Sequence, residues 1–173
     1  MADGGRPLPM DRFIPGPDNI RTLRNALGRF PTGVTVVTIS TPEGPMGITV
    51  NSFASVSLEP PLLLWCPGKA SSRYEAFAGA DRFAIHVLGQ DHLDLAMGFA
   101  KRPDAFDGIA LDDCPNGVPL IADCLARFEC DTVQRHEAGD HCIVVGRVTQ
   151  AALRDGEALV FSEGMFGRFV GAV

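Results

Sequence analysis

The most constraining feature of this sequence is a segment in its C-terminal third where apolar and charged residues alternate. Over residues 124–132 the two kinds fall into two sets: Cys124, Ala126, Phe128 and Cys130 against Arg127, Glu129 and Asp131. Because successive side chains of a strand point to opposite faces, the alternation predicts a half-buried antiparallel strand. A turn at 137–140 and an apolar run at 141–151 follow, so we expect a β-hairpin.

Shorter runs of β-branched and apolar residues predict further strands. They cover residues 34–39, 46–50, 62–66, 83–88 and 159–161, and the run at 62–66 is apolar on both faces, so we expect it to be buried. The first two runs flank the turn at 41–45 and predict a hairpin with a longer loop. Most connections are too short for parallel crossovers, which favours a mainly β, antiparallel barrel with a few flanking α-helices.

Three segments have helical spacing of apolar residues, and each begins at a residue that can cap a helix: Asp18, Ser72 and Asp91. Ser72 and Glu75 match a capping box for a helix that continues to about Ala80, and Gly33 ends the first segment. The expected apolar faces are Ile20, Leu23 and Leu27 in the first helix, and Leu93, Ala96 and Met97 in the third.

Bulk composition excludes several functional classes. The formal net charge of -6 repels nucleic acid and anionic membranes. No apolar run reaches the ~20 residues that a bilayer crossing needs. Residues 1–17 are rich in Gly and Pro and lack the apolar core of a secretory signal, so we expect a flexible arm, one domain over 18–173 and a cytoplasmic protein. The absence of G-x-G-x-x-G and G-x-x-x-x-G-K-[ST] disfavours a doubly wound nucleotide-binding fold.

The cysteines and histidines indicate no metal site. None of the five cysteines (Cys66, Cys114, Cys124, Cys130 and Cys142) forms a C-x-x-C pair, and in a reducing compartment free thiols packed as small hydrophobes are expected. The nearest approach to a zinc cluster is His136 with His141 and Cys142. Neighbours on a strand point to opposite faces, so His141 and Cys142 could not easily share a metal ion.

Polar residues gather in segments that could bind a ligand. Residues 49–61 place hydroxyl and amide side chains at the end of a strand, which suits a flat heteroaromatic ligand or, more simply, a Ser-rich loop that caps its own turns. Residues 69–73 combine two hydroxyls and two cations at a predicted helix N-terminus. This combination is typical of a phosphate-binding site and equally of a plain N-cap. The simplest interpretation of Gly139, Asp140 and His141 is a polar hairpin turn.

Four sequence blocks, in the same order as in a known family, make a resemblance specific. They are T-V-N-S-F-A-S-V-S-L-E-P-P-L, then S-S at a helix start, then R-F-A-I-H-V-L, then G-D-H-C-I-V-V-G-R-V. Together they resemble the flavin-reductase-like FMN-binding split barrel, and more narrowly the reductase components of two-component flavin monooxygenases. The resemblance covers about residues 19–169 and implies a mainly β, antiparallel split β-barrel.

The resemblance also implies which residues bind flavin and nicotinamide. Those near the isoalloxazine and ribityl groups would be Thr49, Val50, Asn51, Ser52, Ser55, Cys66, Pro67, His86 and Val87. The phosphate would be held by Ser71, Ser72 and Lys69. The site would be closed by Phe99, Lys101 and Phe106, with Phe166 and Arg168 close by. His141 matches the histidine that meets the nicotinamide and is the candidate catalytic residue.

Departures from the family pattern leave the cofactor choice open. Gly98 replaces an arginine, and Ala105 replaces the basic residue of a D-K-F signature. Phe161 replaces a tyrosine. The first two changes remove positive charge near the expected phosphate. Both FMN and FAD therefore remain alternatives for the flavin, as do NADH and NADPH for the hydride donor.

The activity implied by the resemblance is hydride transfer from NADH or NADPH to FMN or FAD, in a homodimer that supplies reduced flavin to a partner monooxygenase. Hydride transfer between two cofactors needs no acid–base triad, and none is evident in the sequence. The main alternative is a flavin-binding electron carrier or storage protein on the same barrel. A haem-handling barrel is a second alternative, with His86, His92 or His136 as possible axial ligands.

Overall fold

The computed structural model describes residues 10–113 and 116–171, so much of the expected arm, together with Cys114, lies outside the described residues. The helices and strands follow in this order: η1 (Pro17–Asn19), α1 (Ile20–Leu27), β1 (Thr32–Gly33), β2 (Thr35–Thr41), β3 (Gly44–Val50), β4 (Ala54–Leu58), β5 (Pro61–Trp65), α2 (Tyr74–Gly79), β6 (Arg82–Val87), α3 (Leu93–Lys101), β7 (Leu111–Asp112), β8 (Leu120–Ile121), β9 (Ala126–Ala138), β10 (His141–Leu153), β11 (Leu159–Ser162) and β12 (Met165–Arg168).

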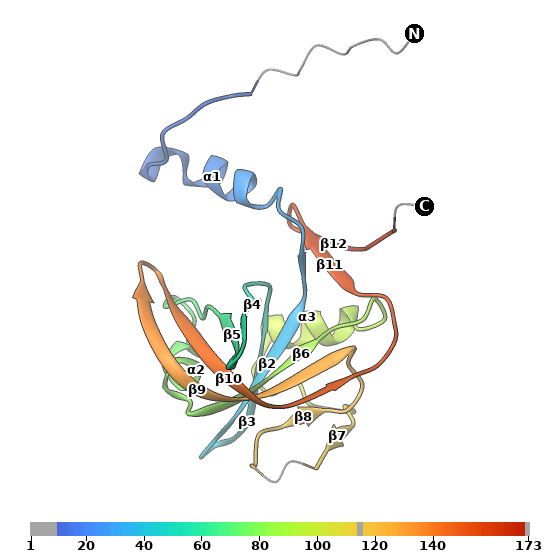
Figure 1. Ribbon diagram of the computed structural model, residues 1–173. Coiled ribbons are helices and arrows are strands. Elements are labelled where there is room, and N and C mark those ends of the chain that lie inside the picture. The colour runs from blue at the N-terminus through green and yellow to red at the C-terminus, as the bar shows by residue number, and fades with distance from the viewer. Residues whose placement is uncertain (1–9, 114–115, 172–173) are drawn as a thin grey trace.

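A seven-stranded antiparallel sheet forms the body of the molecule, with strand order β3-β2-β6-β9-β10-β5-β4. Figure 1 shows this sheet curling around its interior, with α2 and α3 beside it. Two smaller sheets add β1-β11-β12 and β7-β8. The expectation of a mainly β, antiparallel fold with flanking helices is confirmed.

The β9–β10 hairpin follows the alternation found in the sequence. Ala138 pairs with His141 across the turn, and the register continues to Ala126 opposite Leu153, with two irregularities on the way. Gly139 has φ +65°, a conformation that glycine adopts without steric cost, and this allows the tight turn. The hairpin therefore carries His141 to the tip of the sheet.

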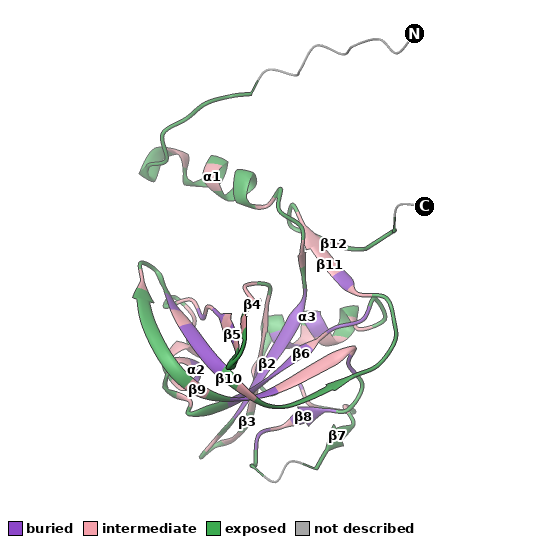
Figure 2. Ribbon diagram, viewed as in Figure 1, coloured by how far each residue is buried: buried purple, intermediate pink, exposed green. Residues whose placement is uncertain are grey.

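Two large apolar clusters and a third, smaller one stabilise the sheet. The first large cluster is built around three aromatic rings, Trp65, Phe77 and Phe83, and the second around Val36, Leu88 and Phe99. Figure 2 shows the buried residues concentrated along β2, β6 and the first half of β10. These strands form the rigid support of the loops that follow β3 and β5.

The predicted burial of residues on β5 and β9 is wrong at several positions. Leu63 and Trp65 of β5 are buried whereas Leu62 and Leu64 are only half-buried, because the apolar cluster that contains Leu63 and Trp65 packs on one face of the strand. Glu129, expected on an exposed face, is 7% exposed. The segment carrying Val118 and Leu120 packs over that face against Ala84, which pairs with Glu129 across β6 and β9.

The helix caps also differ from expectation. Asp18 lies within η1, and the side chain of Asn19 accepts the Gly16 N–H (2.8 Å). Gly28 rather than Gly33 follows the end of α1. The Ser72–Glu75 capping box does not form, since α2 starts at Tyr74. In α3 the buried residues are Ala96 and Phe99, whereas Leu93 and Met97 are exposed.

The N-terminal helix and the last hairpin extend from the sheet. In Figure 1, α1 lies away from the curled sheet and is joined to it through β1, which pairs with β11. Arg29 forms an ion pair with Glu163 (2.5 Å), and the Glu163 N–H donates to the Gly28 carbonyl (2.9 Å). The strand β12, which the sequence did not predict, pairs with β11 through a turn at Gly164 (φ +81°). Among the described residues, no helix has the length and apolarity required to cross a membrane.

Candidate functional site

The hydroxyl groups at the end of β3 mostly bind the protein itself. Thr49 Oγ1 donates to the Ala96 carbonyl (2.7 Å), which ties β3 to α3. Ser52 Oγ accepts the Cys66 N–H (3.0 Å) and donates to the Cys66 carbonyl (3.3 Å). The Val50 carbonyl accepts the Thr35 hydroxyl (3.0 Å), and Ser55 is exposed on β4. These bonds fix the backbone of the segment and leave the exposed Asn51 amide able to reach a ligand.

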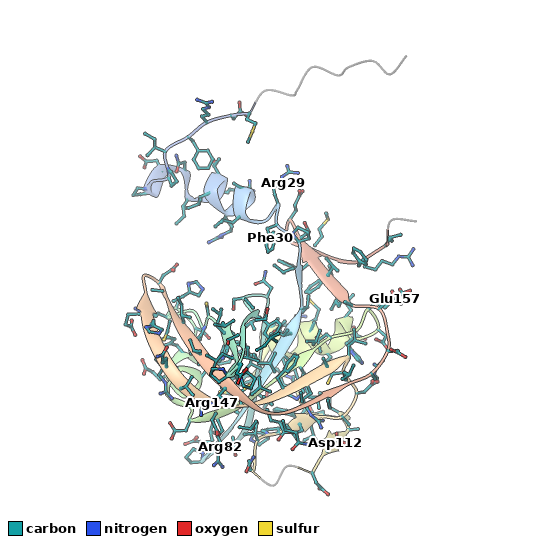
Figure 3. The ribbon with its side chains drawn as sticks, viewed as in Figure 1. Arg29, Phe30, Arg82, Asp112, Arg147 and Glu157 are labelled. Carbon is teal, nitrogen blue, oxygen red and sulfur yellow. The ribbon has the colours of Figure 1, made fainter. Side chains whose placement is uncertain are left out.

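Asn51 lines a cleft of about 620 Å³ between the sheet and the N-terminal helix. The cleft is bounded by residues of α1, of β1, of the segment that joins them and of the β11–β12 hairpin: Arg24, Asn25, Leu27, Gly28, Arg29, Phe30, Thr32, Phe161, Glu163 and Gly164. Figure 3 shows Arg29 and Phe30 where the chain passes from α1 to β1. This contribution of α1 is not predictable from the sequence, because periodicity identifies a helix but not what lies opposite it.

The loop after β5 lies against the β9–β10 turn. The Cys142 N–H donates to the Pro67 carbonyl (3.1 Å), the Lys69 N–H donates to the Asp140 carbonyl (2.9 Å), and Gly68 forms a β-bridge with His141. Lys69 Nζ donates to the Gly139 carbonyl (2.9 Å) and forms an ion pair with Glu137. Its ammonium group thus points to the turn rather than to Ser71 and Ser72.

The thiol of Cys66 is half-buried beside this loop. Burial, and to a smaller extent the nearby Cys142, raise its pKa. The neutral thiol is therefore its form at physiological pH, consistent with a packing role.

His141 presents one ring nitrogen to the loop. Its Nδ1 lies 2.8 Å from Asp140 Oδ1, and this hydrogen bond lowers the pKa of Asp140. A Cβ placed on Gly68 would lie 3.2 Å from His141 Nε2, so Nε2 faces the loop backbone. The side chain is 49% exposed, which leaves it accessible to a ligand.

His86 does not fit the role implied by the resemblance. It is fully buried, with Nδ1 3.1 Å from the Val36 carbonyl and Nε2 accepting the Ile121 N–H (3.0 Å). Both ring nitrogens are occupied, and burial lowers its pKa to about 4. The expectation that His86 contacts the flavin ring is corrected: it is a neutral core histidine. Its neighbour Val87 is half-buried and pairs with Ala126.

The aromatic residues at the end of α3 form a packed pair. Phe99 is fully buried and contacts Phe106, with ring centroids 4.8 Å apart and an interplanar angle of 71°. A Cβ on Gly47 would collide with the Phe99 ring, so glycine at that position lets α3 approach β3. Phe99 therefore supports the site from the core rather than closing over a ligand, whereas Lys101 is exposed and Phe106 is half-buried.

Phe166 and Arg168 lie at a different place. Phe166 packs on Phe161, with centroids 5.1 Å apart, and lines a shallow cavity of about 280 Å³ with Arg168. Gln90, Leu93 and Leu159 complete that cavity. Within a single chain, the structure does not bring this pair together with the loop after β5.

One cluster of possible metal ligands occurs among the described residues, formed by Asp91, His92 and Asp123. His92 Nδ1 accepts the Gly89 N–H (3.1 Å), and Asp123 is bound by Arg154 (2.5 Å). These bonds use one ring nitrogen of His92 and one carboxylate oxygen of Asp123, and His92 Nε2 lies 3.4 Å from the other oxygen, Asp123 Oδ2.

Comparison with known proteins gives consistent matches. A family model described as a flavin reductase like domain matches residues 27–169. FMN reductase (NADH) SmoA of Agrobacterium fabrum is 58% identical over 157 residues, which cover 91% of this chain and 90% of that protein. The reductase subunit HsaB of a Mycobacterium tuberculosis flavin-dependent monooxygenase is 41% identical over 129 residues, 74% of this chain and 69% of that protein. NADH:FAD oxidoreductase SgcE6 of Streptomyces globisporus, solved with NAD and FAD fragments, superimposes with a TM-score of 0.84 at 39% identity, over 92% of this chain and 98% of that chain.

Proposed function

We propose residue roles for an enzyme whose family is known: the chain belongs to the flavin reductase-like family and is an NADH-dependent flavin reductase. Flavin, when bound, supplies the acceptor for the hydride that NADH carries, so the protein has to bind and orient the two ligands. The observation that carries the proposal is the hydrogen-bonded contact between the loop after β5 and the β9–β10 turn. This contact supports a shared site for Ser71, Ser72 and His141.

The donors of the loop fit a phosphate group. Within the described part of the chain, the N–H groups of Ala70 and Ser72 have no protein acceptor, and the side chain of Ser72 is exposed. Oriented N–H and hydroxyl donors are what an anionic phosphate requires. Ser71 and Ser72, with the adjacent backbone, would hold the flavin phosphate, and Asn51 would bind an edge of the ring system.

His141 would orient the nicotinamide. The bond from Nδ1 to Asp140 keeps the proton of the neutral ring on Nδ1, which leaves Nε2 as an acceptor. A nicotinamide carboxamide offers N–H donors to such an acceptor. Asp140 is then the residue that sets the tautomer and orientation of the ring.

The flavin-binding roles can be tested with Ser72→Ala and Asn51→Ala, each compared with Ser40→Ala on the exposed end of β2. Loss of one hydrogen bond costs about 1 kcal/mol, so each site variant should raise the flavin KM about fivefold. The KM for NADH should stay within about twofold. Steady-state rates followed at the nicotinamide absorbance band give both constants, and an unchanged flavin KM in both variants would reject the assignment.

FMN is the proposed flavin. The observation in favour is the 58% identity to a protein named as an FMN reductase. Steady-state kinetics with FMN and with FAD at equal NADH should give the higher kcat/KM for FMN, and the reverse order would contradict the proposal.

The exposed apolar face of α1 supports a homodimer. In the single chain Ile20 is 61% exposed and Leu27 66%, α1 has no buried residue, and Phe30, three residues after the helix, is 75% exposed. Exposed apolar stripes of this kind mark protein interfaces. Leu27→Asp should convert a dimer to a monomer in light scattering, whereas Thr22→Asp on the same helix should not. A wild-type monomer would contradict the proposal.

We also propose that reduced flavin passes to a flavin-dependent monooxygenase in the cytoplasm, where NADH is available. Support comes from HsaB, which is named as a reductase subunit of such an enzyme. A monooxygenase supplied with this protein, flavin and NADH should turn over its substrate. The alternative, an electron carrier, would consume no more than one equivalent of NADH per bound flavin.

A further inference from the structure

Arg73 connects the proposed phosphate loop to the end of α3. Its Nη1 donates to the Gly47 carbonyl (3.1 Å) and the Phe99 carbonyl (2.6 Å), and its Nη2 donates to the Ala100 carbonyl (3.1 Å). The residue is half-buried, and burial lowers the pKa of its guanidinium, which nevertheless stays charged at neutral pH. One side chain thus binds two separate elements, β3 and α3.

The carbonyls of Phe99 and Ala100 belong to the last turn of α3. Carbonyl groups in the last turn of a helix lack intrahelical donors, and a cation there interacts favourably with the helix dipole. The preceding carbonyl, of Gly98, accepts the Arg102 N–H (3.0 Å). The Arg73 side chain therefore caps the C-terminal end of α3 by binding its free carbonyl groups.

The backbone of Arg73 is equally engaged. Its N–H donates to Ser71 Oγ (3.2 Å), so the residue that is anchored on α3 also holds the hydroxyl of Ser71. Lys101 follows the two bound carbonyls directly in sequence. The geometry of Ser71, Ser72 and Lys101 relative to one another consequently depends on the Arg73 side chain.

Gly98 and Ala105, which stand where the family pattern has basic residues, make this dependence on Arg73 more important. A Cβ on Gly98 would lie 3.3 Å from the Ala105 Cβ, so positions 98 and 105 are neighbours in space and neither carries a cation. Arg102 nearby is paired with Asp107 (2.8 Å). Arg73 brings a positive charge to this end of α3, at the place where the family pattern has basic residues.

We propose that Arg73 is a positioning residue that holds the phosphate loop against α3 and so determines how strongly the enzyme prefers phosphorylated flavin. This rests on the proposed phosphate site at Ser71 and Ser72. We expect its effect at the phosphate end, because its backbone N–H holds Ser71 while its side chain is anchored on Gly47, which pairs with Thr38 in the sheet.

Arg135 provides a matched control. It binds the last carbonyls of α2 in the same manner, with Nε donating to Ala78 (2.5 Å) and Nη2 donating to Ala80 (2.8 Å) and Gly79 (3.3 Å). Its contacts lie at the far end of α2 from Ser71 and Ser72. Replacing it removes the same kind of interaction without touching the proposed phosphate loop.

The experiment compares FMN with riboflavin, which lacks the phosphate, in wild type, Arg73→Ala, Arg73→Lys and Arg135→Ala. Dissociation constants come from flavin fluorescence, and thermal unfolding is recorded for each variant. Because small misplacements of binding groups are costly, Arg73→Ala should raise the FMN dissociation constant about tenfold and change that of riboflavin less than twofold. Arg73→Lys keeps the charge but not the fork, so about threefold is expected for FMN. Arg135→Ala should leave the preference unchanged.

Four results would overturn the proposal, and the last of them has a different meaning from the other three. Equal weakening of FMN and riboflavin in Arg73→Ala, or an unchanged FMN constant, would show that Arg73 is only structural. If the alanine variant does not fold, an unchanged FMN-to-riboflavin ratio in Arg73→Lys leads to the same conclusion. A wild-type enzyme that binds riboflavin as tightly as FMN would instead reject the phosphate site itself, and with it the role of Arg73.

Discussion

The surroundings of His86 and of His141 differ in almost every physical respect, although both histidines lie on strands of the same sheet. His86, on β6, is enclosed by the core and has a protein partner at each ring nitrogen. His141, at the start of β10, is half exposed, with Nδ1 bonded to Asp140 and Nε2 facing Gly68. The first imidazole has no nitrogen to offer a ligand, and the second has one.

This difference separates stability from function. A buried imidazole with both nitrogens bonded contributes to folding and resists protonation. An exposed imidazole held by a carboxylate contributes little to folding but is oriented for a ligand. Replacing His86 should therefore affect unfolding, and replacing His141 should affect kinetics.

The largest expected effect comes from His86→Ala. The substitution leaves the Ile121 N–H without its partner and opens a cavity in the core, which should lower the free energy of unfolding by about 4 kcal/mol. Urea unfolding measures this change. His136→Ala, on an exposed part of β9, is the control and should stay within about 0.5 kcal/mol. A loss below about 1 kcal/mol for His86→Ala would show that the site relaxes around the gap.

The pH dependence of the free energy of unfolding should show the contribution of His86 in the wild-type protein itself. The pKa of His86 is lowered from 6.5 to about 4, so its contribution is fully present above pH 6.5 and is lost as the pH falls toward 4. The corresponding loss is ~3 kcal/mol at 1.36 kcal/mol per pKa unit. Asp140, whose pKa is lowered by the bond to His141, loses its contribution only below its ordinary value of 3.8, outside this window.

Unfolding free energies at several pH values, in wild type and in His86→Gln, isolate this contribution. The difference between the two proteins should shrink as the pH falls from 6.5 to 4. A difference independent of pH would mean that the buried imidazole is not the titrating group.

The contrast between the two histidines also marks what the sequence could predict. Alternation along β9 and β10 predicts the hairpin and places His141 at its turn, because strand periodicity and turn residues are local signals. The burial of His86 depends on Ile121, 35 positions away, and the position of the Lys69 ammonium depends on Glu137. Such partners are brought together by tertiary packing, which no local pattern contains. The helix α1 was predicted for the same local reason, whereas the cleft it forms with Asn51 was not.

His141→Ala should reduce kcat/KM for NADH about tenfold, equivalent to ~1.4 kcal/mol of lost transition-state stabilisation. The flavin dissociation constant and the free energy of unfolding should stay close to those of wild type, since the ring is exposed and makes its hydrogen bond at the surface. His136→Ala is again the control. Unchanged kcat/KM for NADH in His141→Ala would remove His141 from the mechanism and leave the turn as a purely structural element.

The smallest effect expected is that of Gly68→Ala, which probes the distance between the loop and His141. The new Cβ would lie 3.2 Å from Nε2 and 3.5 Å from Cδ2, tighter than ordinary contact, so the imidazole would have to shift by a few tenths of an ångström. Because the ring is half exposed it can move, and the unfolding free energy should change by less than about 0.5 kcal/mol. A displaced Nε2 should nevertheless raise the KM for NADH about two- to threefold. Gly79→Ala, where a Cβ meets nothing within 4 Å, is the matched control. The same substitution can be made in the His141→Ala background. If Gly68→Ala raises the KM for NADH more there than in wild type, the methyl group acts on the ligand directly and not through the histidine.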